Sequence, residues 1–287
     1  MKSFDGIANL QRFFGGHPLT CDAPLRAWFR FAKWQVRSRF QGEILVDWVA
    51  GQRLAVHHGM TGATGNIYVG LHEFFDMMVP LHFLRNGDLF LDVGANVGTY
   101  TVLASGVCGA KTFAFEPDPT TVVHLRRNIE VNTLIEHVRV YECALGARSG
   151  EVAFTIGRDT VNRIATSDDA KTRMVRMETI DEIVSGFQPA MMKIDVEGAE
   201  GDVLSGAEHL LANPSLKVIE LETLDQESAK MLARSGFEAA CYDPFRRRLV
   251  RNPTARQSSN SLFIRDWPFV TDRLQMAGQI EVLGRTI

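Results

Sequence analysis

A turn that contains two glycines is the first feature of the sequence that could bind a ligand. It lies in the segment 91–100, LDVGANVGTY, which follows an apolar run. Gly94 and Gly98 let the backbone approach a ligand closely. A helix that begins there would offer free amides and a partial positive charge to a ligand's carboxylate. The residues of this turn that we expect at a binding site are Asp92, Gly94, Asn96, Gly98 and Thr99.

The same pattern differs from two common nucleotide-binding motifs. Asn96 occupies the place of the second glycine in the dinucleotide fingerprint G-x-G-x-x-G, which argues against an NAD-dependent oxidoreductase. No Gly-Lys-Ser/Thr follows, so the segment is not a phosphate loop. The alternative without any ligand is a tight strand-to-helix turn, which many α/β proteins contain.

An acidic residue ends the next apolar segment, Thr112 to Glu116, and Pro117 follows it. A carboxylate at the tip of the second strand, about twenty residues after the glycine turn, is where a nucleotide ribose presents its hydroxyls. Asp118 is the natural cap for a helix that starts at Pro119. We therefore expect Glu116 at the ribose, and the alternative is that it only precedes that helix.

A third acidic segment, KIDVEGAE at 193–200, follows another apolar strand. Its acids should lie at the carboxyl edge of the sheet, where open α/β sheets bind ligands. Asp195 and Glu197 are the expected catalytic residues, since a carboxylate there could take a proton from a reacting hydroxyl. The alternative is that Glu197 and Glu200 only favour a helix N-terminus.

Taken in order, these segments resemble the FkbM family of methyltransferases. The resemblance rests on DVGANVG at 92–98, FEP at 115–117, ALG at 144–146 and KIDVEGAE at 193–200, and extends to ELE at 220–222, NSLF at 260–263 and the upstream GLHE at 70–73. It implies a Rossmann-like, mostly parallel seven-stranded sheet with helices on both faces and an antiparallel last strand. It also implies O-methylation by S-adenosylmethionine of a hydroxyl on a small-molecule or glycan acceptor.

The resemblance also implies roles for individual residues. Gly94, Asn96 and Gly98 would line the methionine part of the cofactor, and Glu116 would hold its ribose. Cys143 and Ala144 would lie near the adenine, and Glu73 would cover the cofactor from the N-terminal side.

Other functions remain as alternatives. They are a nucleic-acid methyltransferase and an inactive cofactor-binding partner protein. Asp195, Glu220 and Glu222 could also hold a magnesium ion that assists the methyl transfer. This metal-dependent mechanism is less favoured, since such acids also serve as general bases without a metal.

Three regions differ in character. Residues 89–222 alternate strand and helix patterns, which predicts a parallel sheet covered by helices. The resemblance extends the methyltransferase domain to residues 66–265. Residues 1–65 form an N-terminal extension with an arginine-rich helix over 24–40, a hairpin over 43–57 and a flexible loop over 59–65. This extension would act as a lid or acceptor region, and residues 266–287 form a tail.

The predicted helix over 24–40 contains an apolar stripe, and Phe31 and Trp34 fall outside it. The stripe consists of Leu25, Trp28, Phe29, Ala32 and Val36. The basic residues beside it fit a solvated face, and the alternative is contact with a membrane or phosphate. A second basic segment, 246–248, is expected to form a turn, which either lies at the surface or faces an anionic acceptor.

Bulk composition narrows the class of protein. The chain has 287 residues, a net charge of −3 and no global basic field, so nucleic acid is not an expected partner. Its four cysteines form no CxxC pair, which excludes a typical zinc site and favours a reducing cytoplasm. No apolar run is long enough to span a membrane. The composition does not indicate an oligomeric state.

Overall fold

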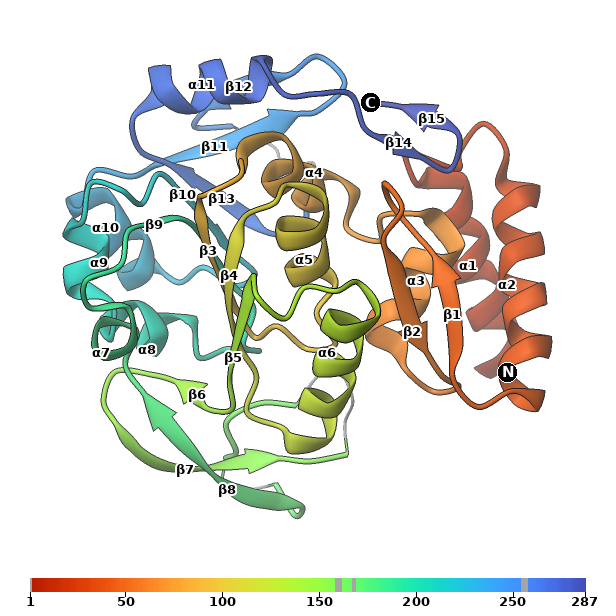
Figure 1. Cartoon of the computed structure of the whole chain (residues 1–287), viewed down its shortest axis with the longest axis horizontal. Coiled ribbons are helices and arrows are strands. Elements are labelled where there is room, and N and C mark those ends of the chain that lie inside the picture. Colours follow the sequence, from red (N-terminus) through yellow and green to blue (C-terminus); the bar gives the residue numbers. More distant parts are fainter. Residues whose placement is uncertain (1, 158–161, 167–168, 254–257) are drawn as a thin grey trace.

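An eight-stranded, mostly parallel sheet forms the centre of the protein (Figure 1). The structure is a computed structural model that describes residues 2–157, 162–166, 169–253 and 258–287. The strands lie in the order β12-β11-β13-β10-β9-β3-β4-β5. Their bounds are β3 Leu89–Val93, β4 Lys111–Phe115, β5 Val138–Tyr141, β9 Pro189–Ile194, β10 Val218–Leu221, β11 Glu238–Asp243, β12 Arg248–Arg251 and β13 Ser261–Ile264.

The strand directions agree with the expected fold class. β5, β4, β3, β9 and β10 run parallel, and β13 is antiparallel to both of its neighbours. Seven strands therefore match the expectation. The eighth, β12, pairs with β11 at the edge of the sheet, because the basic segment turns at 244–247 and continues as a strand from Arg248.

Helices cover both faces of the sheet, as predicted. Along β9, Met191 packs into one buried cluster and Met192 into the other, because successive side chains of a strand point to opposite faces. On the Met191 face lie α4 Phe74–Phe83, α5 Thr99–Val102 with a π-helical turn Leu103–Val107, α6 Pro119–Val131 and α11 Trp267–Gln275. On the other lie α7 Ile180–Val184, α8 Glu200–Ser205, α9 Glu208–Ala212 and α10 Gln226–Arg234.

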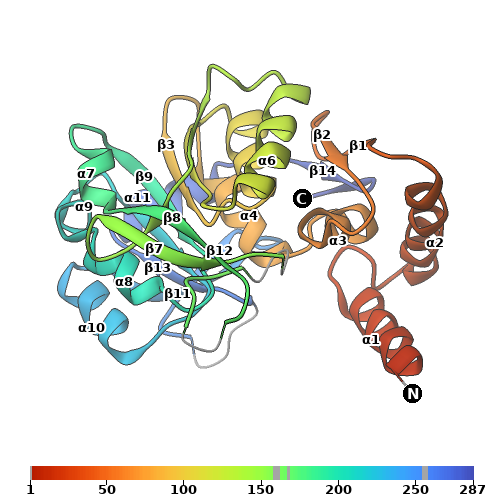
Figure 2. The same cartoon turned by 90° about the horizontal axis from the view of Figure 1, so that it is seen from below.

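The N-terminal extension packs beside this domain around a core of its own (Figure 2). It contains α1 Lys2–Gly16, α2 Pro24–Phe40, the hairpin β1 Ile44–Asp47 and β2 Arg53–Val56, and α3 Thr61–Val69. The helix over 24–40 and the hairpin are thus confirmed. Within the described residues, no helix is both long enough and apolar enough to cross a bilayer.

The apolar stripe found in the sequence is not the buried face of α2. Phe31 lies against Phe14 of α1 and Tyr68 of α3, and Trp34 is buried on the same side. Because these larger rings face the extension's core, most of the predicted stripe is left at the surface. Phe29, for example, is 70% exposed.

The predicted loop over 59–65 is wrong, because α3 begins at Thr61. Glycines disfavour a helix, but tertiary packing outweighs that preference here. Ala63 and Asn66 are buried, and Gly65 fits against the ring of His72, where a Cβ would lie 2.7 Å from Cγ.

Two smaller sheets complete the fold. A three-stranded sheet joins β6 Ala144–Leu145, β7 Gly150–Thr155 and β8 Thr172–Glu178. The tail forms the hairpin β14 Glu281–Val282 and β15 Arg285–Thr286. The Arg285 guanidinium pairs with Asp22 at 2.5 Å, so the tail binds the extension to the main domain.

Candidate active site

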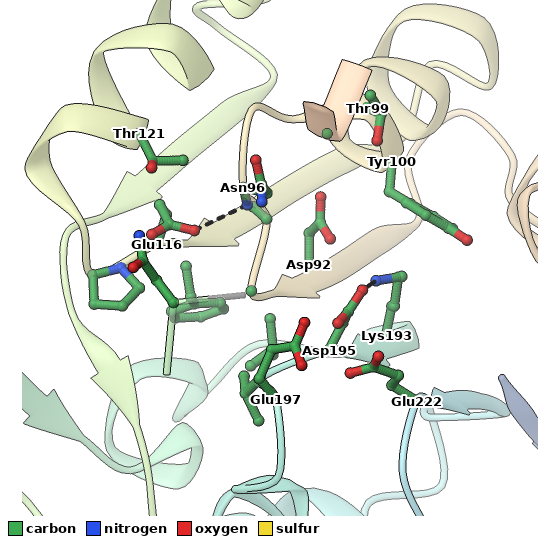
Figure 3. Close-up of a pocket in the computed structure, with 18 of the residues that line it drawn as sticks. Asp92, Asn96, Thr99, Tyr100, Glu116, Thr121, Lys193, Asp195, Glu197 and Glu222 are labelled. Atoms are coloured by element: carbon green, nitrogen blue, oxygen red, sulfur yellow. Dashed lines mark hydrogen bonds and ion pairs between the residues drawn. The ribbon is translucent and has the colours of Figure 1, made fainter. Parts of the chain in front are cut away.

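A cavity of about 430 Å³ opens at the carboxyl edge of the parallel strands (Figure 3). It brings together segments that lie far apart in the sequence. The predicted residues that line it are Glu73, Asp92, Gly94, Asn96, Thr99, Glu116, Pro117, Cys143, Ala144, Asp195 and Glu197. Gly98 is not among the lining residues.

The glycine turn between β3 and α5 forms the floor of the cavity. Gly94 has a φ of 78°, and a Cβ there would lie 1.8 Å from the backbone oxygen of Asp195. Only glycine therefore lets the strand tips of β3 and β9 meet so closely. Gly98 is the left-handed N-cap of α5, where a Cβ would lie 2.5 Å from Leu125 Cδ1. Its role is close packing against α6.

Glu116 joins the tip of β4 to this turn. One carboxylate oxygen accepts a hydrogen bond from the Asn96 amide at 3.0 Å, and the other accepts one from the Asp118 amide at 2.9 Å. Burial raises the pKa of Glu116 to about 7, although both amides oppose that shift. Asp118 accepts from the Thr120 amide and caps α6, as expected.

A row of buried ionisable side chains crosses the three central strands, and two of its members line the cavity. Lys193 of β9 is in register with Asp92 of β3 and with Glu220 of β10, and all three side chains share one face. Burial alone would lower the pKa of Lys193, but the carboxylates of Asp195, Glu73 and Asp92 raise it above its usual value. The Lys193 ammonium is therefore a fixed positive charge within the site.

Lys193 also fixes the state of the predicted catalytic acid. Its ammonium lies 2.5 Å from an Asp195 carboxylate oxygen. Burial would raise the pKa of Asp195, but this contact outweighs burial and lowers it. Asp195 is therefore ionised in the site.

Two further acids stand beside Asp195 (Figure 3). Burial and the nearby Asp195 raise the pKa of Glu222 to about 8. Burial first, then Asp195 and Glu200, raise the pKa of Glu197. Single ligand atoms of Asp195, Glu197 and Glu222 lie within 4.8 Å of one another.

The structure differs from the predicted acidic group in one member. Glu220 points beneath the cavity, where both of its carboxyl oxygens have no hydrogen-bond partner among the described residues. Burial raises its pKa well above the usual value. Glu220 and Glu222 lie two residues apart, but Glu220 lies deeper, fully buried within β10, whereas Glu222 follows the end of the strand and is only partly buried. The acids that gather are thus Asp195, Glu197 and Glu222.

The N-terminal side of the cavity is closed by Glu73, which precedes α4. The Tyr100 hydroxyl donates to a Glu73 carboxylate oxygen at 2.8 Å, and the Lys193 ammonium lies 4.5 Å from the centre of the Tyr100 ring. Tyr100 and Lys193 line the cavity but were not predicted as binding or catalytic residues, and Glu222, which also lines it, was predicted only as a possible magnesium ligand. A lysine inside an otherwise apolar strand was the available signal for Lys193.

Carboxyl groups dominate the ionisable side chains of the cavity lining, although burial raises the pKa of Asp92, Glu116, Glu197 and Glu222. Six carboxyl groups line it, those of Glu73, Asp92, Glu116, Asp195, Glu197 and Glu222, together with the single ammonium of Lys193. Such a lining suits a ligand with a cationic centre and opposes one with a pyrophosphate.

The fold and the site together define a class of protein. Five parallel strands with an antiparallel neighbour, a glycine turn after β3 and an acid after β4 are the features of class I methyltransferases. Members of this class transfer the methyl group of S-adenosylmethionine.

Comparison with known proteins leads to a particular family. The family model of the methyltransferase FkbM domain matches residues 92–239. The chain therefore belongs to the FkbM family of methyltransferases.

The individual relatives share less than 30% sequence identity with this chain. The chain is 28% identical to the hexuronic acid methyltransferase AglP of Haloferax volcanii over 139 residues, which cover 47% of this chain and 56% of that protein. It is 26% identical to Methyltransferase 1 of Beauveria bassiana, over 60% of this chain and 80% of that one. A solved structure, the FkbM methyltransferase of Methylobacillus flagellatus, aligns with a TM-score of 0.46 and 16% identity, covering 70% of this chain and 52% of that one.

Proposed function

We propose that the protein transfers a methyl group from S-adenosylmethionine to a hydroxyl oxygen of a small-molecule or glycan acceptor. The observation that carries the proposal is the position of Asp195. This ionised acid lines the same cavity as the glycine turn and Glu116, and it stands beside Glu197 and Glu222.

The proposed cofactor position follows from the lining of the cavity. The methionine part would lie over the turn at Gly94 and Asn96, and the ribose hydroxyls would bind the Glu116 carboxylate. The adenine would lie near Cys143 and Ala144. The sulfonium carries a positive charge, and the excess of carboxyl groups would stabilise it.

In this position the methyl carbon would face the acids at the tip of β9. The acceptor oxygen attacks that carbon in line, the carbon–sulfur bond breaks, and the sulfur leaves as a neutral thioether. The acceptor hydroxyl would donate a hydrogen bond to Asp195, which aligns the oxygen lone pair. Asp195 then takes the proton as the new carbon–oxygen bond forms.

The acceptor class draws support from one relative. The name of the archaeal relative states that it methylates a hexuronic acid, and sugars offer hydroxyls of the kind that this site would use. The acidic lining opposes a polyanionic acceptor, so it favours a glycan or small molecule over nucleic acid.

Acceptor profiling tests the proposal. The full chain is incubated with methyl-labelled S-adenosylmethionine and separate panels of uronic acid glycosides, neutral glycosides, small alcohols and RNA, and products are identified by mass spectrometry. We expect label on a hydroxyl oxygen and at least about a hundredfold less with Asp195→Asn at equal protein concentration. Label on nitrogen or on RNA would overturn the acceptor class. Cofactor binding without transfer to any panel would favour the inactive partner protein.

A metal-assisted version of the same reaction is the second candidate, favoured by the grouping of Asp195, Glu197 and Glu222. Magnesium bound there would lower the pKa of the acceptor hydroxyl. The ion pair between Asp195 and Lys193 makes the metal-free version the one that we propose. Activity that vanishes with a chelator and returns with magnesium would reverse this choice.

A further inference from the structure

α2 lies at the outer edge of the molecule (Figures 1 and 2). Its outer face carries apolar side chains that the described residues leave exposed. Four large ones are exposed by more than half: Leu25 at 80%, Phe29 at 70%, Val36 at 59% and Phe40 at 85%. Ala32 is exposed as well. These residues recur every three or four positions, so they form one stripe along the helix. We call it the outer stripe.

Basic side chains flank the outer stripe on both sides. At about 100° per residue, Arg26, Lys33 and Arg37 lie along one flank and Arg39 along the other. All four are exposed, and none forms an ion pair with an acid in the described residues. The fifth basic residue, Arg30, turns inward and donates to the Tyr68 carbonyl. The helix contains no Asp or Glu.

The opposite face of α2 is buried and packs the helix against the rest of the extension. Ala27, Trp34 and Ser38 are buried there, and Phe31 packs against its neighbours. The outer stripe is therefore not needed for the extension's own core. An apolar stripe flanked by cations is the pattern of helices that lie at the boundary of lipid headgroups and acyl chains.

We propose that α2 docks the protein on an anionic phospholipid surface. The stripe would enter the boundary of the acyl chains, and the flanking cations would contact phosphate groups above it. The helix has 17 residues, so the contact would be about 25 Å long. A second copy of the chain is disfavoured as the occupant, because two such helices would bring like charges together along both flanks.

The position of α2 gives this docking a consequence for the cavity. α2 packs on α3 through Phe31 and Tyr68, and Thr61, Gly62 and Asn66 of α3 line the cavity. Docking would therefore hold one wall of the cavity near the membrane surface. The inference itself rests on α2 alone and is independent of the proposed reaction.

Vesicle flotation tests the proposal with the full chain. The vesicles contain phosphatidylcholine alone or phosphatidylcholine mixed with phosphatidylglycerol. We expect the protein to float with the anionic vesicles and to be released by high salt. Arg37→Gln with Arg39→Gln should lower partitioning about thirtyfold. Phe29→Ser with Val36→Ser should lower it by about tenfold or more.

Matched control variants show whether these effects are specific to α2. Ile135→Ser removes an apolar side chain that is 65% exposed on another surface, and Arg148→Gln removes an exposed cation there. Both should float like the parent. Unchanged S-adenosylmethionine affinity in the α2 variants would show that they are folded.

Three outcomes would overturn the inference. The parent stays unbound with anionic vesicles, or the outer-stripe variants float as well as the parent. Alternatively, light scattering shows a dimer that Phe29→Ser with Val36→Ser converts to a monomer, which would make the stripe an interface between copies.

Discussion

Asp195 is held in its ionised state by a buried cation, and this limits what it contributes to methyl transfer. With its pKa lowered by Lys193, Asp195 is a weak base before the reaction but a strong hydrogen-bond acceptor. Its contribution should therefore lie mainly in the transition state, where the acceptor proton becomes acidic. We expect Asp195→Asn to keep the cofactor dissociation constant within about threefold and to lower kcat by roughly 10²–10⁴-fold.

The matched control for this prediction is Asp202→Asn, an exposed acid on α8. Steady-state kinetics and calorimetry on both variants make the comparison. A kcat equal to that of the parent in Asp195→Asn would remove Asp195 from the mechanism and leave Glu197 as the next residue to test.

The raised pKa of Glu222 predicts that the relative affinities for S-adenosylmethionine and its demethylated product depend on pH. Its raised pKa of about 8 means that it is mostly neutral at pH 7 and becomes negatively charged as the pH rises through 8. The sulfonium of S-adenosylmethionine is cationic and the thioether of S-adenosylhomocysteine is neutral. The ratio of their affinities should therefore shift towards S-adenosylmethionine by about tenfold between pH 6.5 and 9.

Calorimetry with both ligands at each pH measures this ratio, in which the titration of their shared amino group cancels. Glu222→Gln cannot ionise, so its ratio should be flat. A parent ratio that does not change with pH would show that Glu222 does not face the sulfonium.

Glu116 has two functions that one substitution would remove together. It holds the amides of Asn96 and Asp118 and, in the proposal, the ribose. We expect Glu116→Ala to weaken S-adenosylmethionine binding by roughly tenfold to a hundredfold, since a charge-assisted hydrogen bond contributes about 1.5–3 kcal/mol. Glu130→Ala, an exposed acid on α6, serves as the control. Unchanged affinity in Glu116→Ala would leave Glu116 with its structural function alone.

At the scale of elements, the meeting of β3 and β9 depends on one glycine. A Cβ on Gly94 would overlap the Asp195 backbone oxygen, so Gly94→Ala must push the two strand tips apart. We expect it to weaken cofactor binding by more than about a hundredfold. Gly87→Ala is the control, because its φ of 91° carries the same backbone strain with nothing within 4 Å. Equal affinities in the two variants would show that the overlap does not matter.

The sequence predicts this part of the molecule well, because its signals are local. Apolar strands, the glycine turn and acids at strand ends specify the order of elements and bring eleven predicted residues to one cavity. The Lys193–Asp195 pair could not be predicted in the same way. It depends on strand register, which places Lys193 beside Asp92 and Glu220.

The differences concern packing between elements. The outer stripe of α2 has the same helical spacing as a core stripe, and only the fit of Phe31 and Trp34 against α1 and α3 decides which face is buried. The glycines near Thr61 likewise predict a loop from propensity alone. The segment instead forms α3, in which Gly65 packs closely against the ring of His72.

At the scale of the whole molecule, the extension builds one side of the cavity, and the tail packs against the extension. Thr61, Gly62 and Asn66 of α3 line the cavity, and Val282 of the tail packs against the Gly70 turn that ends α3. This wall lies outside the residues 92–239 that the family model matches. The part of the cavity that the family model covers would bind the cofactor, and the added wall would select the acceptor.

A substitution at Thr61 can test whether α3 contacts the acceptor and not the cofactor. Thr61 is exposed and lines the cavity, so a larger side chain there would narrow the entrance without displacing the core. We expect Thr61→Trp to lower kcat/KM for the acceptor by about tenfold or more and to leave S-adenosylmethionine affinity within about twofold. Thr64→Trp, on the same helix but not in the cavity lining, should keep both values. A loss of cofactor affinity in Thr61→Trp would mean that α3 covers the cofactor, so acceptor choice would then have to come from the walls formed by the main domain.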